Sequence, residues 1–207
     1  MGGESPHNRV SKSLCDLVRH ASQERVRIYS RRDDFTLHEM PDGYQVGNVL
    51  GNWMSLILMG GESVRITLKL HFAYRDVKAI AHPIYGADSS EQISDAQATD
   101  FVKELCNLIA GFLVQIFEQN DLSLGISLPL CTRGLYEVFA DYTPTSEPLI
   151  RFSDLWVMES NDGIRLPGSV LFEVMDAKRL EKLLDFDPEQ GAGEEEDDDN
   201  DEGFDFL

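Results

Sequence analysis

The segment from Ser94 to Gln119 has the strongest periodic pattern in the chain. Its apolar side chains fall within one broad arc of a helix drawn at about 100° per residue. They are Phe101, Val102, Leu105, Cys106, Ile109, Phe112, Leu113, Ile116 and Phe117. Ser94 with Gln97 three residues later fits a capping box, and the pattern stops at Asn120. We predict a helix over about Asp95–Gln119 that covers a hydrophobic core with this arc.

The opposite side of this helix is a narrow polar strip. It consists of Gln97, Asp100, Glu104, Asn107, Gly111, Gln115 and Glu118. Glu104 and Asn107 are one turn apart and therefore lie side by side. Gly111 costs about 1 kcal/mol relative to alanine inside a helix, and core packing does not explain it on a wet face. It would leave a flat place for a second protein, although an ordinary solvated face is the simpler interpretation from periodicity alone.

A hairpin is predicted before this helix. Apolar residues alternate with polar ones over Val64–Phe72, which is the pattern of a strand with one buried face. The apolar run Ser55–Met59 precedes it, and Gly60 and Gly61 can form the turn between them.

The remaining segments complete an α+β arrangement. Further helices are predicted at Val10–Ala21, Tyr74–Ala81 and Asp176–Leu184, and further strands at Leu124–Leu130, Leu149–Glu159 and Gly168–Met175, whereas Arg31–Gly51 is turn-rich and unassigned. A turn around Asn161–Gly163 joins the last two strands. The order predicts helices packed on an antiparallel or mixed sheet in two loosely similar halves, without a recognisable residue-level repeat.

Charge divides the chain into a folded part and a tail. The net charge is −19, but Asp185–Leu207 holds twelve acidic and no basic residues. We predict one domain over residues 1–186 and a disordered acidic tail over residues 187–207. The excess of negative charge would repel phosphates, so nucleic acid is not expected as a partner.

Other classes of protein are also disfavoured. Cys15, Cys106 and Cys131 are odd in number and widely spaced, and the five histidines show no ligand spacing, so neither a disulfide framework nor a metal site is predicted. The longest apolar stretch, Leu105–Phe117, is too short to span a bilayer. The first residues lack the pattern of an export signal. A cytoplasmic protein without a membrane segment is expected.

The helix also carries a family resemblance. Its stretch Glu104-Leu-Cys-Asn107-Leu-Ile-Ala-Gly111 resembles the E-x-x-N helix of the CheX/CheC/FliY chemotaxis phosphatases. Ile126-Ser-Leu-Pro129 resembles the strand after that helix, and Ser55–Gly86 the hairpin and short helix before it. The likeness covers about Met54–Met175. The first half has no second E-x-x-N, so the chain is most similar to single-site CheX.

This resemblance implies a CheC-like fold and a reaction. The expected activity is hydrolysis of the aspartyl phosphate on a CheY-like response-regulator receiver domain, in chemotaxis or two-component signalling. Asn107 would position the attacking water, and Glu104 would pair with a lysine of the receiver. Asp100, Gly111 and Gln115 would belong to the partner-binding surface. The receiver would supply Mg²⁺, with no cofactor bound by this chain, and a homodimer formed by joining sheets is a further possibility.

Two alternatives stay open. One is a noncatalytic adaptor that binds a receiver or belongs to a flagellar switch. The other is an interaction protein that acts through its acidic tail, with Phe204, Phe206 and Leu207 as apolar anchors.

Overall fold

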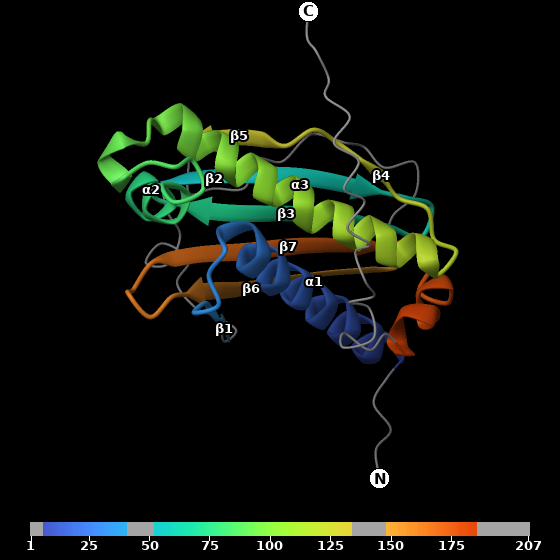
Figure 1. Ribbon diagram of the computed structural model, residues 1–207. Helices are drawn as coiled ribbons and strands as arrows, with labels where there is room; N and C mark the ends of the chain where they lie inside the picture. Colours follow the sequence, from blue (N-terminus) through green and yellow to red (C-terminus); the bar gives the residue numbers. More distant parts are fainter. Residues whose placement is uncertain (1–5, 41–51, 134–147, 186–207) are drawn as a thin grey trace, which may run out of the picture.

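A computed structural model describes residues 6–40, 52–133 and 148–185 (Figure 1). The helices are α1 (Pro6–Ser30), α2 (Tyr74–Ala81) and α3 (Asp95–Gln119), with 3₁₀ turns at Ser90–Gln92 and Arg179–Asp185. The strands are β1 (Thr36–Glu39), β2 (Trp53–Gly60), β3 (Val64–Phe72), β4 (Gly125–Ile126), β5 (Leu130–Arg133), β6 (Ile150–Glu159) and β7 (Arg165–Val174). None of the helices in these ranges is long and apolar enough to cross a membrane.

Within the described residues, the strands form one seven-stranded sheet in which every pairing is antiparallel. The order is β1-β6-β7-β3-β2-β4, and β5 pairs with a different part of β2 on the same side as β4. The hairpins β2–β3 and β6–β7 meet at the centre, where Leu68 lies opposite Val170. The predicted α+β class is confirmed, and the sheet is antiparallel rather than mixed.

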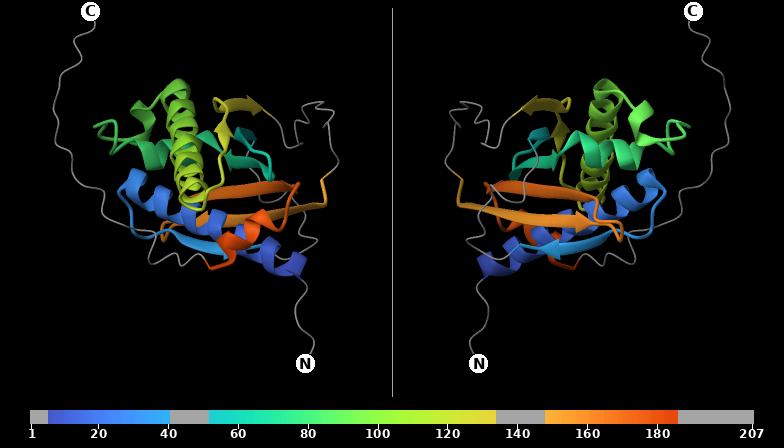
Figure 2. Two further views of the ribbon diagram at one scale, coloured as in Figure 1. Left: turned by 90° about the vertical axis from the view of Figure 1, so that its right-hand side faces the viewer. Right: turned by 90° about the vertical axis from the view of Figure 1, so that its left-hand side faces the viewer.

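Both long helices lie on the same face of this sheet (Figures 1 and 2). The apolar arc predicted for α3 is buried along its whole length, from Phe101 to Phe117. It shares one hydrophobic cluster with α1 and with helix-facing residues of β3 and β7, including Leu68 and Phe172. Burial of this continuous apolar surface is the main source of stability for the fold.

Several predicted elements are confirmed. The helix Asp95–Gln119, the short helix α2 and the hairpin β2–β3 have the expected positions. Gly61 also has a packing role, because a Cβ there would lie 2.4 Å from the backbone oxygen of Ser123. A side chain at this turn would push the segment after α3 away from the sheet.

Other elements differ from the predictions. The strand expected at Leu124–Leu130 is two short strands, β4 and β5, with Pro129 between them, because proline has no N–H for a ladder. The 3₁₀ helix Arg179–Asp185 takes the place of the predicted closing helix. The strand β1 lies in the segment that was left unassigned, and the predicted acidic tail lies outside the described residues.

The helix α1 is longer than the predicted Val10–Ala21. It spans Pro6–Ser30. The second half of α1 has a polar sequence because several of its positions are arginines. One of them, Arg25, nevertheless packs on α3, with its guanidinium carbon 4.5 Å from the centre of the Phe112 ring. Such cation–π packing lets a charged residue face a neighbouring helix, and a hydrophobic pattern does not show it.

The two halves are related by structure. One consists of α1, β1 and the hairpin β2–β3, and the other of α3, β4 with β5, and the hairpin β6–β7. Each half lends its short strand to the hairpin of the other, since β1 pairs with β6 while β4 and β5 pair with β2.

This correspondence exposes a residue-level repeat that was not recognised in the sequence. Lys12-Ser-Leu-Cys-Asp-Leu-Val18 on α1 matches Lys103-Glu-Leu-Cys-Asn-Leu-Ile109 on α3 at four of seven positions. The match is too short to find by scanning the chain, and the place of each helix in its half of the fold identifies it.

Candidate functional site

The start of α3 is fixed by its cap. The hydroxyl of Ser94 accepts a hydrogen bond from the backbone N–H of Gln97 at 3.2 Å, and the side-chain oxygen of Gln97 accepts one from the backbone N–H of Ser94 at 3.0 Å. This is the predicted capping box. It sets where the helix begins and therefore which residues of α3 face away from the core.

Glu104 and Asn107 lie together on that outer face. Glu104 is exposed and Asn107 is half-buried. The side-chain N–H of Asn107 donates to Oε2 of Glu104 at 3.3 Å. The bond holds the amide in one orientation and leaves its carbonyl oxygen and second N–H available. An oriented amide that can both accept and donate is suited to holding a water molecule.

Cys106 lies beneath this pair, between α3 and the sheet. The Cys106 thiol is fully buried and donates to the backbone oxygen of Ser55 on β2 at 3.7 Å. Burial raises its pKa to about 12. A nucleophilic cysteine acts as the thiolate, so Cys106 is no candidate nucleophile. Its role is to pack the helix onto the sheet.

The predicted partner surface surrounds the pair. Asp100, Gly111 and Gln115 are all exposed on the same strip of α3. A Cβ added at Gly111 would meet no atom within 4 Å, so no contact inside the described structure requires glycine there. The structure thus brings all five predicted site residues onto one face, although Asn107 is more buried than expected for a fully wet strip.

Two tyrosines that the sequence analysis missed flank this strip. The ring of Tyr29, on the last turn of α1, stacks on Phe101 of α3 with 4.9 Å between centroids. The hydroxyl of Tyr85, after α2, donates to the backbone oxygen of Gln97 at 3.3 Å. Burial and nearby negative charge, including that of Glu104, raise the pKa of both phenols. No local pattern indicates these contacts, because they depend on how α1 and α2 pack against α3.

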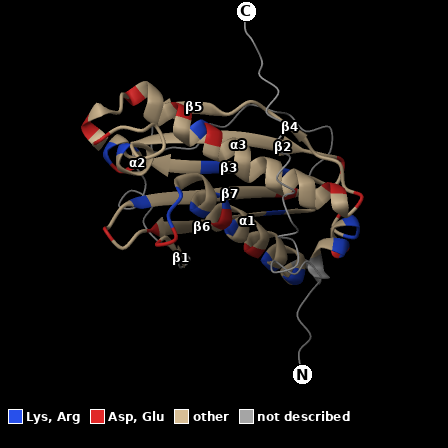
Figure 3. Cartoon of the chain, in the orientation of Figure 1, with Lys and Arg blue, Asp and Glu red and all other residues tan. Residues whose placement is uncertain are grey.

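The strip is acidic at its N-terminal end (Figure 3). Asp95 pairs with Lys78 at 2.6 Å, but Asp100 and Glu104 have no basic partner among the described residues. Lys103 lies on the other flank of α3, where its charge opposes the rise in the pKa of Cys131 that burial causes. Two carboxylates on this face are therefore free to meet a cation from outside.

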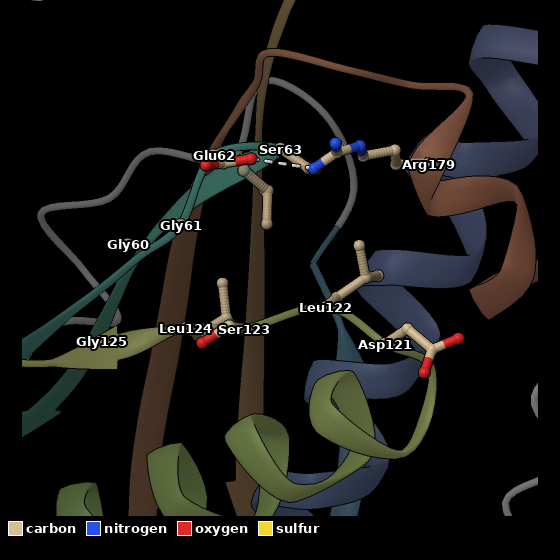
Figure 4. Close-up of a pocket in the computed structure, with 11 residues that line it drawn as sticks. Gly60, Gly61, Glu62, Ser63, Asp121, Leu122, Ser123, Leu124, Gly125 and Arg179 are labelled. Atoms are coloured by element: carbon tan, nitrogen blue, oxygen red, sulfur yellow. Dashed lines mark hydrogen bonds and ion pairs between the residues drawn. The ribbon is translucent and has the colours of Figure 1, made fainter.

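A cavity of about 470 Å³ lies elsewhere, at the C-terminal end of α3 (Figure 4). Its lining comes from the β2–β3 turn, the segment after α3, and Arg179, which donates to Glu62 at 2.9 Å. Neither Glu104 nor Asn107 lines it. Among the described residues there is also no cluster of three or more histidine, cysteine or acidic side chains that could hold a metal ion. The candidate site is thus an open helix face.

Comparison with known proteins gives matches only in structure. No family model matches the chain, and no curated protein is similar in sequence. Among solved structures, CheX in the CheX–CheY–BeF₃–Mg complex of Borrelia burgdorferi is 12% identical over 77% of this chain and 97% of its own, with a TM-score of 0.57. A CheC-like superfamily protein from Shewanella sp. PV-4 is 16% identical over 80% and 97%, with a TM-score of 0.52.

The chain has the CheC-like fold. A third structure of this shape is that of FliM in the FliM–SpeE complex of H. pylori, which is 9% identical over 88% of this chain and 96% of its own, with a TM-score of 0.54. The fold expected from the E-x-x-N helix is therefore confirmed. The CheC-like fold by itself does not choose between a phosphatase and an adaptor, because CheX and FliM structures resemble this chain to a similar degree.

Proposed function

We propose that this protein is a phosphatase that hydrolyses the aspartyl phosphate of a CheY-like receiver domain. One observation carries the proposal: within a CheC-like fold, Asn107 is oriented by a hydrogen bond from its amide to Glu104, on a helix face that is open to a partner. The match to CheX in a complex with CheY supports the same class of partner.

Hydrolysis of an aspartyl phosphate needs few catalytic groups. An acyl phosphate is already activated, so the main task is to place a water in line with the departing carboxylate. The water oxygen bonds to phosphorus as the bond to the aspartate oxygen breaks, and the products are inorganic phosphate and the free carboxylate. Asn107 would accept a hydrogen bond from that water through its carbonyl oxygen, and the protons of the water leave with the phosphate, so no shifted pKa is needed.

Glu104 has a different role in this proposal. As an anion it would repel the phosphate, so it acts by orienting the Asn107 amide and by pairing with a lysine of the receiver. Asp100, Gly111 and Gln115 would contact the same partner. The Mg²⁺ that neutralises the phosphate would be held by the receiver and not by this chain.

Phosphate release from a panel of phosphorylated receiver domains tests this proposal. Each receiver is assayed with and without the protein, because receivers lose phosphate on their own. At least one receiver should be dephosphorylated at least tenfold faster with the wild-type protein. Glu104→Ala should raise KM for that receiver, because a docking charge is lost. If the wild-type protein accelerates no receiver in the panel, the phosphatase proposal is wrong.

An adaptor is the second candidate, favoured by the likeness to FliM. Its signature is binding of a receiver loaded with beryllofluoride and Mg²⁺, without faster release of phosphate. The tail-driven alternative concerns residues outside the described ranges. It predicts that a chain ending at residue 186 loses its partner, whereas both receiver-binding proposals predict that this shorter chain keeps it.

A homodimer also stays a proposal. The described sheet ends in β1 on one side and in β4 and β5 on the other, and unpaired strand edges can join two copies of a chain. Sedimentation equilibrium would measure the mass directly. A monomer at high micromolar concentration would exclude the dimer.

A further inference from the structure

We infer that Tyr29 and Tyr85 form an aromatic wall beside Glu104 that receives one basic side chain of the partner, a lysine or an arginine. This inference rests on the proposed function, since it concerns the same face of α3. It adds two residues from outside α3 that would determine which partner docks.

Tyr85 is a rigid part of this wall. It lies in a turn held by hydrogen bonds from its own backbone N–H to Ala81 at 3.1 Å and from Ala87 to His82 at 2.9 Å. Its hydroxyl bond to Gln97 then fixes the ring against the start of α3. The side chain is nevertheless 41% exposed. A held but exposed aromatic ring loses little entropy on binding, which is why tyrosines are frequent among the residues that dominate interfaces.

Tyr29 forms the second part of the wall, from the α1 side. Its ring is half-buried and stacked on Phe101, one turn before Glu104. Tyr29 stacks on Phe101 and Tyr85 bonds to Gln97, so both rings lie against the first turns of α3, the part of the helix on which Glu104 is exposed. The pKa of each phenol is raised by burial and also by the nearby charge of Glu104, which agrees with this placement.

Charge identifies what this region would bind. Asp100 and Glu104 lack a basic partner among the described residues, and Tyr85 is exposed, so carboxylates and an aromatic ring are available to a cation. The protein already uses this combination nearby. Lys78 lies 5.9 Å from the ring centre of Tyr74 and 2.6 Å from a carboxylate oxygen of Asp95. An ammonium or guanidinium of the partner would be held in the same way.

Replacing Tyr85 separates this role from catalysis. We expect Tyr85→Ala to raise the Kd for a CheY-type receiver loaded with beryllofluoride and Mg²⁺ by about fivefold to tenfold. Tyr85→Phe should lose less affinity than Tyr85→Ala, because it keeps the ring that contacts the cation and loses only the hydroxyl bond to Gln97 that holds the ring in place. The kcat at saturating phosphorylated receiver should stay unchanged for both, since Asn107 is untouched. Leu128→Ala, at a side chain that is 89% exposed between β4 and β5, is the control for lost apolar area.

A double-mutant cycle tests the cation itself. Each exposed lysine and arginine of the receiver is replaced by methionine, and the binding loss caused by Tyr85→Ala should vanish for one of them. If no replacement reduces that loss, the basic side chain is the wrong occupant.

The outcomes also separate this inference from the proposed function. If a thermally stable Tyr85→Ala variant binds and turns over a receiver like the wild type, the aromatic wall is wrong and the phosphatase proposal stands. If the wild-type protein binds no receiver, both are wrong.

Discussion

The two long helices of this protein share a scaffold but differ in what they present to solvent. Both are 25 residues long and both lie on the same face of the sheet. The repeat aligns Ser13 of α1 with Glu104 of α3, and Asp16 with Asn107. At these two positions α1 therefore has neither the long acid nor the amide that forms the candidate site on α3.

The neighbours of these positions differ as well. Arg19, which aligns with Ala110 of α3, makes a two-pronged pair with Asp154 of β6 at 2.6 and 2.7 Å. It also pairs with Glu39 and, at 3.6 Å, with Asp16. The outward acid of α1 is thus part of a network that holds the helix on the sheet. The comparison teaches that one copy of the scaffold is committed to internal ion pairs while the other is left open to a partner.

The strongest way to break this comparison is to remove the two aligned polar groups one at a time. Asn107→Ala should reduce turnover of a phosphorylated receiver by about 100-fold or more, because the group that positions the water is lost while the helix is kept. Asp16→Ala should leave turnover within about twofold of the wild type. Both rates come from the same phosphate-release assay. Equal rates for Asn107→Ala and the wild type would refute the mechanism while leaving the fold intact.

The next largest effect is on stability and comes from the ion pair between Arg19 of α1 and Asp154 of β6. Arg19→Met should lower the free energy of unfolding by about 2 kcal/mol, because Asp154, whose side chain is only 11% exposed, is left without its partner. Lys103→Met on α3 is the control and should change it by less than about 0.5 kcal/mol. Urea denaturation of both variants measures the difference. Similar losses would show that α3 depends on ion pairs as much as α1 does.

A smaller effect is expected from replacing Gly111 of α3 by alanine. Gly111→Ala should raise the free energy of unfolding by about 1 kcal/mol, since a Cβ there meets no atom and alanine is the better helix former. The same change should weaken receiver binding if the flat surface at Gly111 is used for docking. Calorimetry and a binding titration on the same sample distinguish the two. A more stable variant with unchanged binding would remove Gly111 from the proposed interface.

The smallest expected effect is a dependence of stability on pH that comes from His20 of α1. Burial lowers the pKa of His20 beside the ring of Phe112. The unfolded chain therefore binds a proton more readily as the pH falls through about 6.5, so this contribution to stability is present above that pH and is lost below it. His20→Gln should show a slightly smaller loss of urea stability than the wild type between pH 7.5 and 5.5. An identical loss would mean that other groups account for the dependence.

Local patterns were enough for the elements whose structure depends on near neighbours. The capping box, the apolar arc of α3, the outward strip and the hairpin β2–β3 all follow from spacing along the chain, because helix and strand periods decide which side chains share a face. The helix period placed Glu104 and Asn107 side by side, and the resemblance to the E-x-x-N helix made them the candidate pair. The second half of α1 and the strand β1 were missed, since one depends on arginines packed against α3 and the other on pairing with β6.

The sequence by itself determined the polar strip on α3 and the α+β class, and its resemblance to the E-x-x-N helix made Glu104 and Asn107 the candidate pair. Only the tertiary structure decided that the short strands are exchanged between the halves, that Arg19 ties α1 to β6, and that Tyr29 and Tyr85 pack against the first turns of α3. These features join residues far apart in the chain. No local period specifies such contacts, because they form only when burial of the common hydrophobic core brings separate segments together.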